Sequence, residues 1–181
     1  NVIIKNNIIH PNGGYVIFNN SSSENNNNQI IDNHIECQSQ GNYTEIHAYF
    51  TTIKGNYIES KQSNSTIYGH GNIITENEIY SHSSSNFSLI FSNSEDDNTV
   101  IEDNYIEYSG SGSTIYGQHL TIRNNRIVGD NIASYAIKIV GPDEHSSISN
   151  NIITTVGNGL FLSGGGLDVE YNVIDCGGTG I

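Results

Sequence analysis

The sequence predicts an all-β fold, a right-handed parallel β-helix of about seven to eight coils with three short strands in each coil. The main observation is a six-residue phrase that returns eight times, with an aliphatic residue at each end and an asparagine in the fourth place. It first reads IKNNII at Ile4–Ile9 and last reads VEYNVI at Val169–Ile174. Its asparagines follow one another at steps of 26, 23, 21, 27, 21, 26 and 21 residues. Such a period indicates a solenoid, in which a coil buries its apolar face only by stacking on its neighbours.

The composition agrees with a fold made of narrow coils and many tight turns. Hydrophobic residues make up 35% of the chain, and Asn, Gly and Ser are abundant. A solenoid tolerates this composition because each strand needs only one or two inward aliphatic residues. Asn and Gly enter left-handed backbone conformations at low cost, which suits the turns.

The first two strands of each coil meet at the asparagine of the phrase. The aliphatic residue three positions before it closes the first strand, at Ile4, Ile30, Ile53, Ile74, Ile101, Ile122, Ile148 and Val169. The aliphatic residue two positions after it opens the second, at Ile9, Ile35, Ile58, Ile79, Ile106, Ile127, Ile153 and Ile174. We expect the asparagine itself to adopt the left-handed conformation at this corner and to bond to its counterpart in the next coil. The predicted ladder is Asn7, Asn33, Asn56, Asn77, Asn104, Asn125, Asn151 and Asn172.

A third strand follows in each coil, at 15–18, 45–48, 66–69, 88–91, 114–117, 136–139 and 159–162. The alternative, a left-handed hexapeptide helix, has fixed coils of about 18 residues, which the observed spacing excludes. Longer polar stretches at 21–28, 92–98 and 129–134 are expected to be loops on the flanks. Within one of them, Glu95, Asp96 and Asp97 form a possible Ca²⁺ site, although three adjacent acids lack the usual ligand spacing.

The charge limits the partners of this protein. The net charge is −13, from 19 acidic and six basic residues, which argues against nucleic acid and anionic lipid. No apolar run is long enough to insert into a membrane. We expect residues 1–181 to form one β-helix segment of a longer solenoid, because the pattern is cut at both ends. The exposed end strands then predict end-to-end or lateral self-association.

The two cysteines, Cys37 and Cys176, occupy the same place in the repeat, four residues after their asparagines. Six coils separate them, a distance of roughly 29 Å at the spacing of adjacent strands. A disulfide requires Cα atoms closer than about 7 Å. The sequence therefore predicts two unpaired cysteines, buried as small core residues.

On these repeats the chain resembles the pectate-lyase-like superfamily and, within it, the repeats of copper-reductase accessory proteins and archaeal surface proteins. The resemblance covers essentially the whole chain but is architectural. Members include polysaccharide lyases, hydrolases, epimerases, tailspikes, adhesins and non-enzymatic surface modules. The fold alone therefore does not imply one function.

Strand alternation predicts which side chains of the third strands face outward. One expected outward column is Ile17, His47, Tyr68, Ile90, Tyr116, Lys138 and Phe161, and the next is Asn19, Tyr49, His70, Ser92, Gln118, Val140 and Ser163. Glu45, two residues before His47, is also expected to point outward. The second strands are expected to expose His34, Tyr57, Glu78, Tyr105 and Arg126, then Glu36, Glu59, Tyr80, Glu107 and Asp175, as a solubilising face.

The cluster of His47, Tyr68 and His70 contains groups that β-elimination of a uronate needs. A histidine could remove the proton beside the carboxylate and the tyrosine could protonate the leaving oxygen. The pairing of Glu45-Ile46 with Gly69-His70-Gly71 one coil later is loosely similar to the alginate lyase and chondroitinase B family. That family's arginine falls on Gly69 and its lysine has no counterpart here. Its pattern is therefore incomplete in this chain.

These observations favour an extracellular or cell-envelope module that binds or displays a glycan without catalysis. The expected ligand-binding residues are Glu45, Tyr49, Tyr116, Lys138 and Phe161, because aromatic faces stack on sugar rings. The first alternative is a polysaccharide lyase or epimerase acting at His47, Tyr68 and His70. The second is a purely structural element of a fibre, adhesin or tailspike. No cofactor is expected beyond the possible Ca²⁺.

Overall fold

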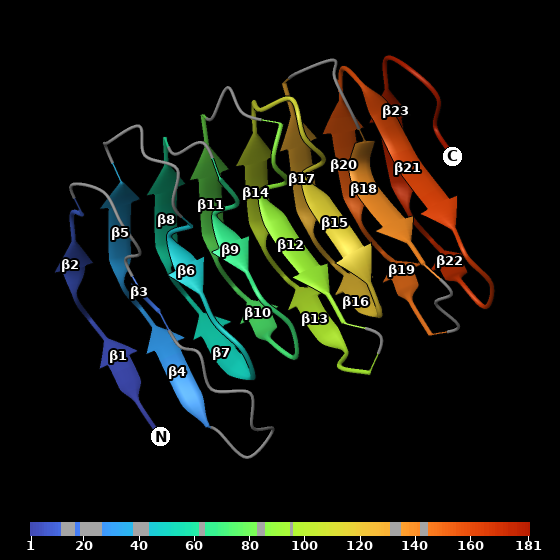
Figure 1. Cartoon of the computed structure of the whole chain (residues 1–181). Coiled ribbons are helices and arrows are strands. Elements are labelled where there is room, and N and C mark those ends of the chain that lie inside the picture. Colours follow the sequence, from blue (N-terminus) through green and yellow to red (C-terminus); the bar gives the residue numbers. More distant parts are fainter. Residues whose placement is uncertain are drawn as a thin grey trace.

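The computed structural model describes residues 1–11, 17–18, 27–37, 44–61, 64–82, 86–94, 96–130, 135–141 and 145–181. Throughout these residues the regular structure is β-strand, and none of them is helical. The strands form three parallel sheets that run along the length of the molecule (Figure 1). The chain is a right-handed parallel β-helix with three strands per coil, which confirms the predicted fold class. Among the described residues there is no helix that has the length and apolarity to cross a membrane.

Each coil contributes one strand to each sheet, so every sheet is a stack of strands from successive coils. The first sheet contains β1 (Ile3–Lys5), β4 (Asn28–Ile31), β7 (Thr51–Lys54), β10 (Ile73–Thr75), β13 (Thr99–Glu102), β16 (Leu120–Arg123), β19 (Ser147–Ser149) and β22 (Asp168–Glu170). The second contains β2 (Ile8–Ile9), β5 (His34–Cys37), β8 (Tyr57–Ser60), β11 (Glu78–Ser81), β14 (Tyr105–Tyr108), β17 (Arg126–Gly129), β20 (Ile152–Thr155) and β23 (Val173–Cys176). The third contains β3 (Ile17–Phe18), β6 (Ile46–His47), β9 (Ile67–Tyr68), β12 (Ile90–Asn93), β15 (Ile115–Gln118), β18 (Tyr135–Val140) and β21 (Asn158–Ser163).

The core is a set of aliphatic columns, one from each sheet. In the first sheet Ile30 pairs with Ile53, and in the second Ile35 pairs with Ile58, and all four side chains are buried. The phrase isoleucines of the middle coils are buried in the same way, as predicted. Stacking identical β-branched residues fills a narrow interior with few atoms, which explains how a chain of low hydrophobicity holds a core.

The asparagine ladder forms along the corner between the first two sheets, as predicted. Along all seven steps the Nδ2 group of one asparagine donates to Oδ1 of the next, at 2.9–3.1 Å. At Asn104, Nδ2 also donates to the carbonyl oxygens of Ile74 and Glu102, each at 2.9 Å. Its Oδ1 atom accepts from both the backbone N–H and the Nδ2 group of Asn77, at 3.0 Å each. The buried amide is therefore fully paired, as a buried polar group must be.

The prediction that the ladder asparagines adopt the left-handed conformation is wrong. The left-handed residue is the one before each asparagine, with φ between 52° and 66°, at Asn6, Asp32, Gly55, Glu76, Asp103, Asn124, Asn150 and Tyr171. This residue turns the backbone, and none of these side chains is buried. The asparagine that follows is free to direct its amide along the stack. The corner thus divides the two tasks, bend and hydrogen bond, between neighbouring residues.

Neither cysteine forms a disulfide bond, as predicted. Cys37 is fully buried, in agreement with its expected core position, but Cys176 is partly exposed. The two lie in one inward column of the second sheet, and β23, which carries Cys176, is the last strand of that sheet. Among the described residues no further strand covers that side of β23.

Candidate functional site

The outer face of the third sheet carries a column of aromatic residues in successive coils. Register pairs join His47 to Tyr68, Tyr68 to Phe91, Phe91 to Tyr116, Tyr116 to Lys138, and Lys138 to Phe161. The Tyr68 and Phe91 rings stack with centroids 5.2 Å apart, and Phe91 and Tyr116 stack at the same distance. We call Tyr68, Phe91, Tyr116, Lys138 and Phe161 the aromatic column.

Lys138 continues this column through its charge. Its Nζ atom lies 5.5 Å from the centroid of the Tyr116 ring and 5.4 Å from that of Phe161. Both distances fit cation–π contacts, so the ammonium group is held between two rings. Tyr68 and Phe161 are each 36% exposed, which leaves aromatic surface open to solvent over several coils. Tyr116, Lys138 and Phe161, expected as ligand-binding residues, thus lie on one continuous face.

The predicted outward column is wrong at two positions, Ile17 and Ile90. Both are buried, because Ile17 pairs with Ile46 and Ile90 pairs with Ile67 in the core. The outward partner in the fourth coil is Phe91, and Phe18 is the backbone partner of His47 in the first. In the second predicted column Ser92 and Gln118 are likewise buried rather than exposed. The predicted register of the strands at Ile17 and Ile90 is wrong by one residue, because the loops before them differ in length from those of the other coils.

His47, Tyr49, Tyr68 and His70 come together at one end of the aromatic column, as the sequence predicted. His47 Nε2 lies 2.9 Å from the Tyr49 hydroxyl, and the His47 and Tyr68 ring centroids are 4.7 Å apart. The Tyr49 and His70 rings also meet at 4.7 Å. Burial lowers the pKa of His47, so its imidazole is biased towards the neutral form that a general base requires.

Asp97 joins this cluster, which sequence reasoning did not anticipate. Its Oδ2 atom lies 2.9 Å from Nδ1 of His70, which is within ion-pair distance when the imidazole is protonated. The contact does not have the geometry of a hydrogen bond. Asp97 also accepts a hydrogen bond from the Ser94 hydroxyl at 3.0 Å. The only signal in the sequence is that Asp97 lies one coil after His70. Both residues stand seven positions before a ladder asparagine, His70 before Asn77 and Asp97 before Asn104, so counting residues places them in adjacent coils.

The expected Ca²⁺ site falls partly outside the described residues, since Glu95 is not among them. Of its other two members, Asp97 contacts His70 and Ser94, and Asp96 is exposed. Across the described residues no group of three or more His, Cys, Asp or Glu side chains could hold a metal ion.

The prediction that Glu45 points outward is wrong. Its side chain has no exposed surface and lies inside the β-helix, where the Ser60 hydroxyl donates to Oε1. The second carboxyl oxygen, Oε2, has no hydrogen-bond partner among the described residues. The same holds for the side-chain Oγ1 atom of buried Thr66. Thr66 lies in the neighbouring coil, where its backbone carbonyl oxygen accepts from the N–H of Ile46. Burial raises the pKa of Glu45 to about 8, so the carboxyl group is mainly protonated at neutral pH. The backbone turns into β6 at Glu45, and this turn directs the side chain inward.

A groove opens beside the middle of the aromatic column. It has a volume of about 280 Å³ and is lined by Phe91, Tyr116 and Lys138 and by two segments, residues 86–88 and 111–113. Phe87, which is 57% exposed, supplies a further aromatic side chain that sequence reasoning missed. Phe87 lies in a loop, where strand alternation gives no prediction.

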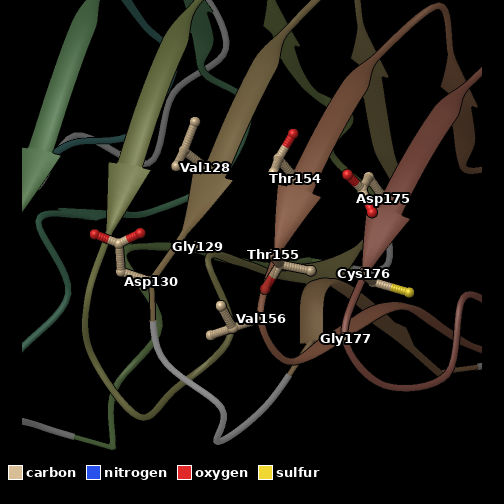
Figure 2. A pocket seen from close by; sticks show the side chains of 9 residues that line it. All are labelled: Val128, Gly129, Asp130, Thr154, Thr155, Val156, Asp175, Cys176 and Gly177. Carbon is tan, nitrogen blue, oxygen red and sulfur yellow. The ribbon is translucent and has the colours of Figure 1, made fainter.

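A second hollow of about 350 Å³ lies at the carboxyl ends of β17, β20 and β23 (Figure 2). Val128, Thr154 and Asp175 come from these three neighbouring strands. Its two carboxylates, Asp130 and Asp175, stand at opposite sides of the hollow in Figure 2. This hollow therefore lacks the convergence of aromatic and charged groups that the groove has.

The outer face of the second sheet shows the polar columns that the sequence predicted. His34, Tyr57, Glu78, Tyr105 and Arg126 are register partners in successive strands. Tyrosine hydroxyls donate to neighbouring carboxylates, from Tyr57 to Glu59 at 2.9 Å and from Tyr105 to Glu107 at 2.8 Å. The bond to Glu59 raises the pKa of Tyr57 to about 12. These groups satisfy one another, which fits a solvated face.

Together the fold and the exposed column define a class of protein, a parallel β-helix with a column of aromatic residues on one outer face. Residues 50–181 match the family described as periplasmic copper-binding protein (NosD), and since this is well over half of the chain, the protein belongs to that family. Neither the curated proteins nor the solved structures gave a match. The membership agrees with the expected β-helix superfamily at the level of fold. The resemblance to alginate lyases and chondroitinase B stays a prediction.

Proposed function

We propose that this protein is a β-helix module of the cell envelope or extracellular space that binds a glycan along the aromatic column. The single observation that carries the proposal is the unbroken sequence of ring contacts from Tyr68 to Phe161 on one outer face. Because the rings stack on one another, each presents its outward edge, and together they offer a rigid apolar strip to the apolar faces of sugar rings. The periplasmic description of the family supports the location.

The column suits an extended ligand. Successive coils of a β-helix are about 4.8 Å apart, so four aromatic residues and Lys138 present a strip roughly 19 Å long. Such a strip matches several consecutive sugar units of an oligosaccharide better than a small molecule. The strip is also pre-formed, because its residues are fixed by strand pairing, and a pre-formed surface loses little entropy on binding.

Copper is not part of this proposal, although the family description names it. The described residues do not fit a resident copper ion, because they hold no group of three potential ligands. Cys37 is buried among core residues, and the chain contains no methionine.

The test is binding of a panel of oligosaccharides by isothermal titration calorimetry. Tyr116→Ala removes one central ring of the column and is expected to weaken binding by about 1–3 kcal/mol. Tyr105→Ala is the matched control, since Tyr105 is an outward tyrosine of the second sheet. Equal effects of the two substitutions, or no binding by the unmodified protein, would contradict the proposal.

Elimination of a uronate by the His47, Tyr68 and His70 cluster is the second candidate. The Asp97 carboxylate, 2.9 Å from Nδ1 of His70, favours it, because a carboxylate beside a histidine is a common arrangement in acid–base catalysis. Against it, the nearest cation of the aromatic column, Lys138, lies three strands away from Tyr68, too far to neutralise the substrate carboxylate there. Release of unsaturated, ultraviolet-absorbing products that His70→Ala abolishes would establish the lyase. We expect no product.

A further inference from the structure

A buried tyrosine holds the wall of the groove in place. Tyr108 takes an inward position of the second sheet where Ser81 and Gly129 stand in the neighbouring coils. Its hydroxyl donates to the carbonyl oxygen of Phe87 and accepts from the N–H of Gly112 at 3.1 Å. One side chain thus connects both segments that form the wall.

The two segments are also packed tightly against each other. The Ser111 hydroxyl donates to Oδ1 of Asn86. A Cβ atom on Gly112 would lie 2.3 Å from the carbonyl oxygen of Phe87, so the backbones approach as closely as only glycine permits. The groove is therefore pre-organised beside Phe91 and Tyr116.

Lys138 gives this groove its charge. Four of the six basic residues pair with carboxylates, namely Lys5, Lys54, Lys61 and Arg123. Within the described part of the chain, Lys138 has no carboxylate at ion-pair distance, and its Nζ contacts are the two rings. On a protein of net charge −13, an ammonium group without a carboxylate partner in an aromatic groove is complementary to an anion.

We propose that the groove takes one acidic sugar unit of an otherwise neutral glycan, with its ring against Phe91 and Tyr116 and its carboxylate at Lys138 Nζ. This inference rests on the proposed function and adds the chemistry of the ligand. The remaining column residues, Tyr68 and Phe161, are uncharged and suit neutral units. A chain made only of uronates is disfavoured, because the single cation neutralises one carboxylate while the acidic protein repels the others.

The experiment compares three oligosaccharides of equal length by calorimetry: one neutral, one with a single central glucuronate, and one made entirely of uronates. We expect the singly acidic ligand to bind about tenfold more tightly than the neutral one, the gain of one charge-assisted hydrogen bond. The uronate polymer is expected to bind most weakly. High salt should remove the preference for the acidic unit and leave neutral binding unchanged.

Lys138→Met keeps an unbranched side chain between the two rings and removes the charge. It is expected to make the neutral and singly acidic ligands equal in affinity, with an unchanged thermal unfolding midpoint. Lys54→Met is the control, because Lys54 pairs with Glu76 at 2.8 Å on another face. If the salt-sensitive preference is missing in the unmodified protein, or if Lys138→Met keeps it, this inference is wrong while glycan binding stands. If none of the three ligands binds, the proposed function itself is wrong.

Discussion

The asparagine corner and the third sheet belong to the same coils but are stabilised in opposite ways. At the corner every coil repeats the same amide contacts at 2.9–3.1 Å, and the buried polar groups are all used. On the third sheet the outward residues change from coil to coil and the flanking loops differ in length. Because the ladder amides bond to one another, the corner leaves no buried amide donor or acceptor for a ligand. The variable side keeps aromatic side-chain surface and a cation within reach of a ligand.

The largest expected effect comes from breaking the corner. Asn104→Ala removes donors to Asn125, Ile74 and Glu102 and the acceptor for Asn77. Each buried group left unpaired costs about 1–3 kcal/mol, so we expect a loss of about 3 kcal/mol or more in the free energy of unfolding. Urea denaturation measures it. Asn98→Ala is the control, because Asn98 is exposed and, among the described residues, its side chain bonds only to Thr121. It should change stability by less than about 0.5 kcal/mol.

The intermediate effect concerns Glu45, the polar group that enters the core from the third sheet. Its pKa is raised from 4.5 to about 8 in the folded protein, so the folded state holds a proton that the unfolded state releases. Its contribution to stability is full below pH 4.5, decreases as the pH rises and is lost above about 8. Glu45→Gln, which stays neutral, is expected to lack this decrease.

Unfolding curves of both proteins across this pH range isolate the effect of Glu45 from that of the other carboxylates. We expect the unmodified protein to lose a few kcal/mol relative to Glu45→Gln between pH 4.5 and 8. Parallel pH profiles for the two proteins would mean that the carboxyl group ionises normally, and the buried placement would then be wrong.

The smallest effect on stability is expected at the groove. Phe87→Ser changes an exposed side chain, so the free energy of unfolding should move by less than about 0.5 kcal/mol. Glycan affinity should nevertheless fall several-fold, because the ring lines the groove. Calorimetry and urea denaturation on the same sample test both statements. A variant that loses stability but keeps its affinity would reverse the contrast between the two regions.

The sequence by itself determined the β-helix, the three strands per coil, the inward isoleucines and the ladder from Asn7 to Asn172. Each of these follows from a periodic pattern, and periodicity is preserved when strands stack in register. The sequence also predicted the meeting of His47, Tyr49, Tyr68 and His70, because these residues lie in adjacent coils with similar spacing from the ladder. Where the coil length is regular, counting residues is enough.

Only the tertiary structure decided the places where loops set the register. Phe91 rather than Ile90 faces outward and Glu45 is buried, and both residues lie beside a loop of variable length. A shift of one residue exchanges the two faces of a strand, so an uncertain loop length reverses the prediction. The sequence also did not show that the left-handed residue is the one before each asparagine. Either of the two neighbouring residues can make the bend, and only the backbone angles show which one does. The groove at Lys138 exists because Tyr108 joins two loops across one coil, a contact that no local pattern encodes.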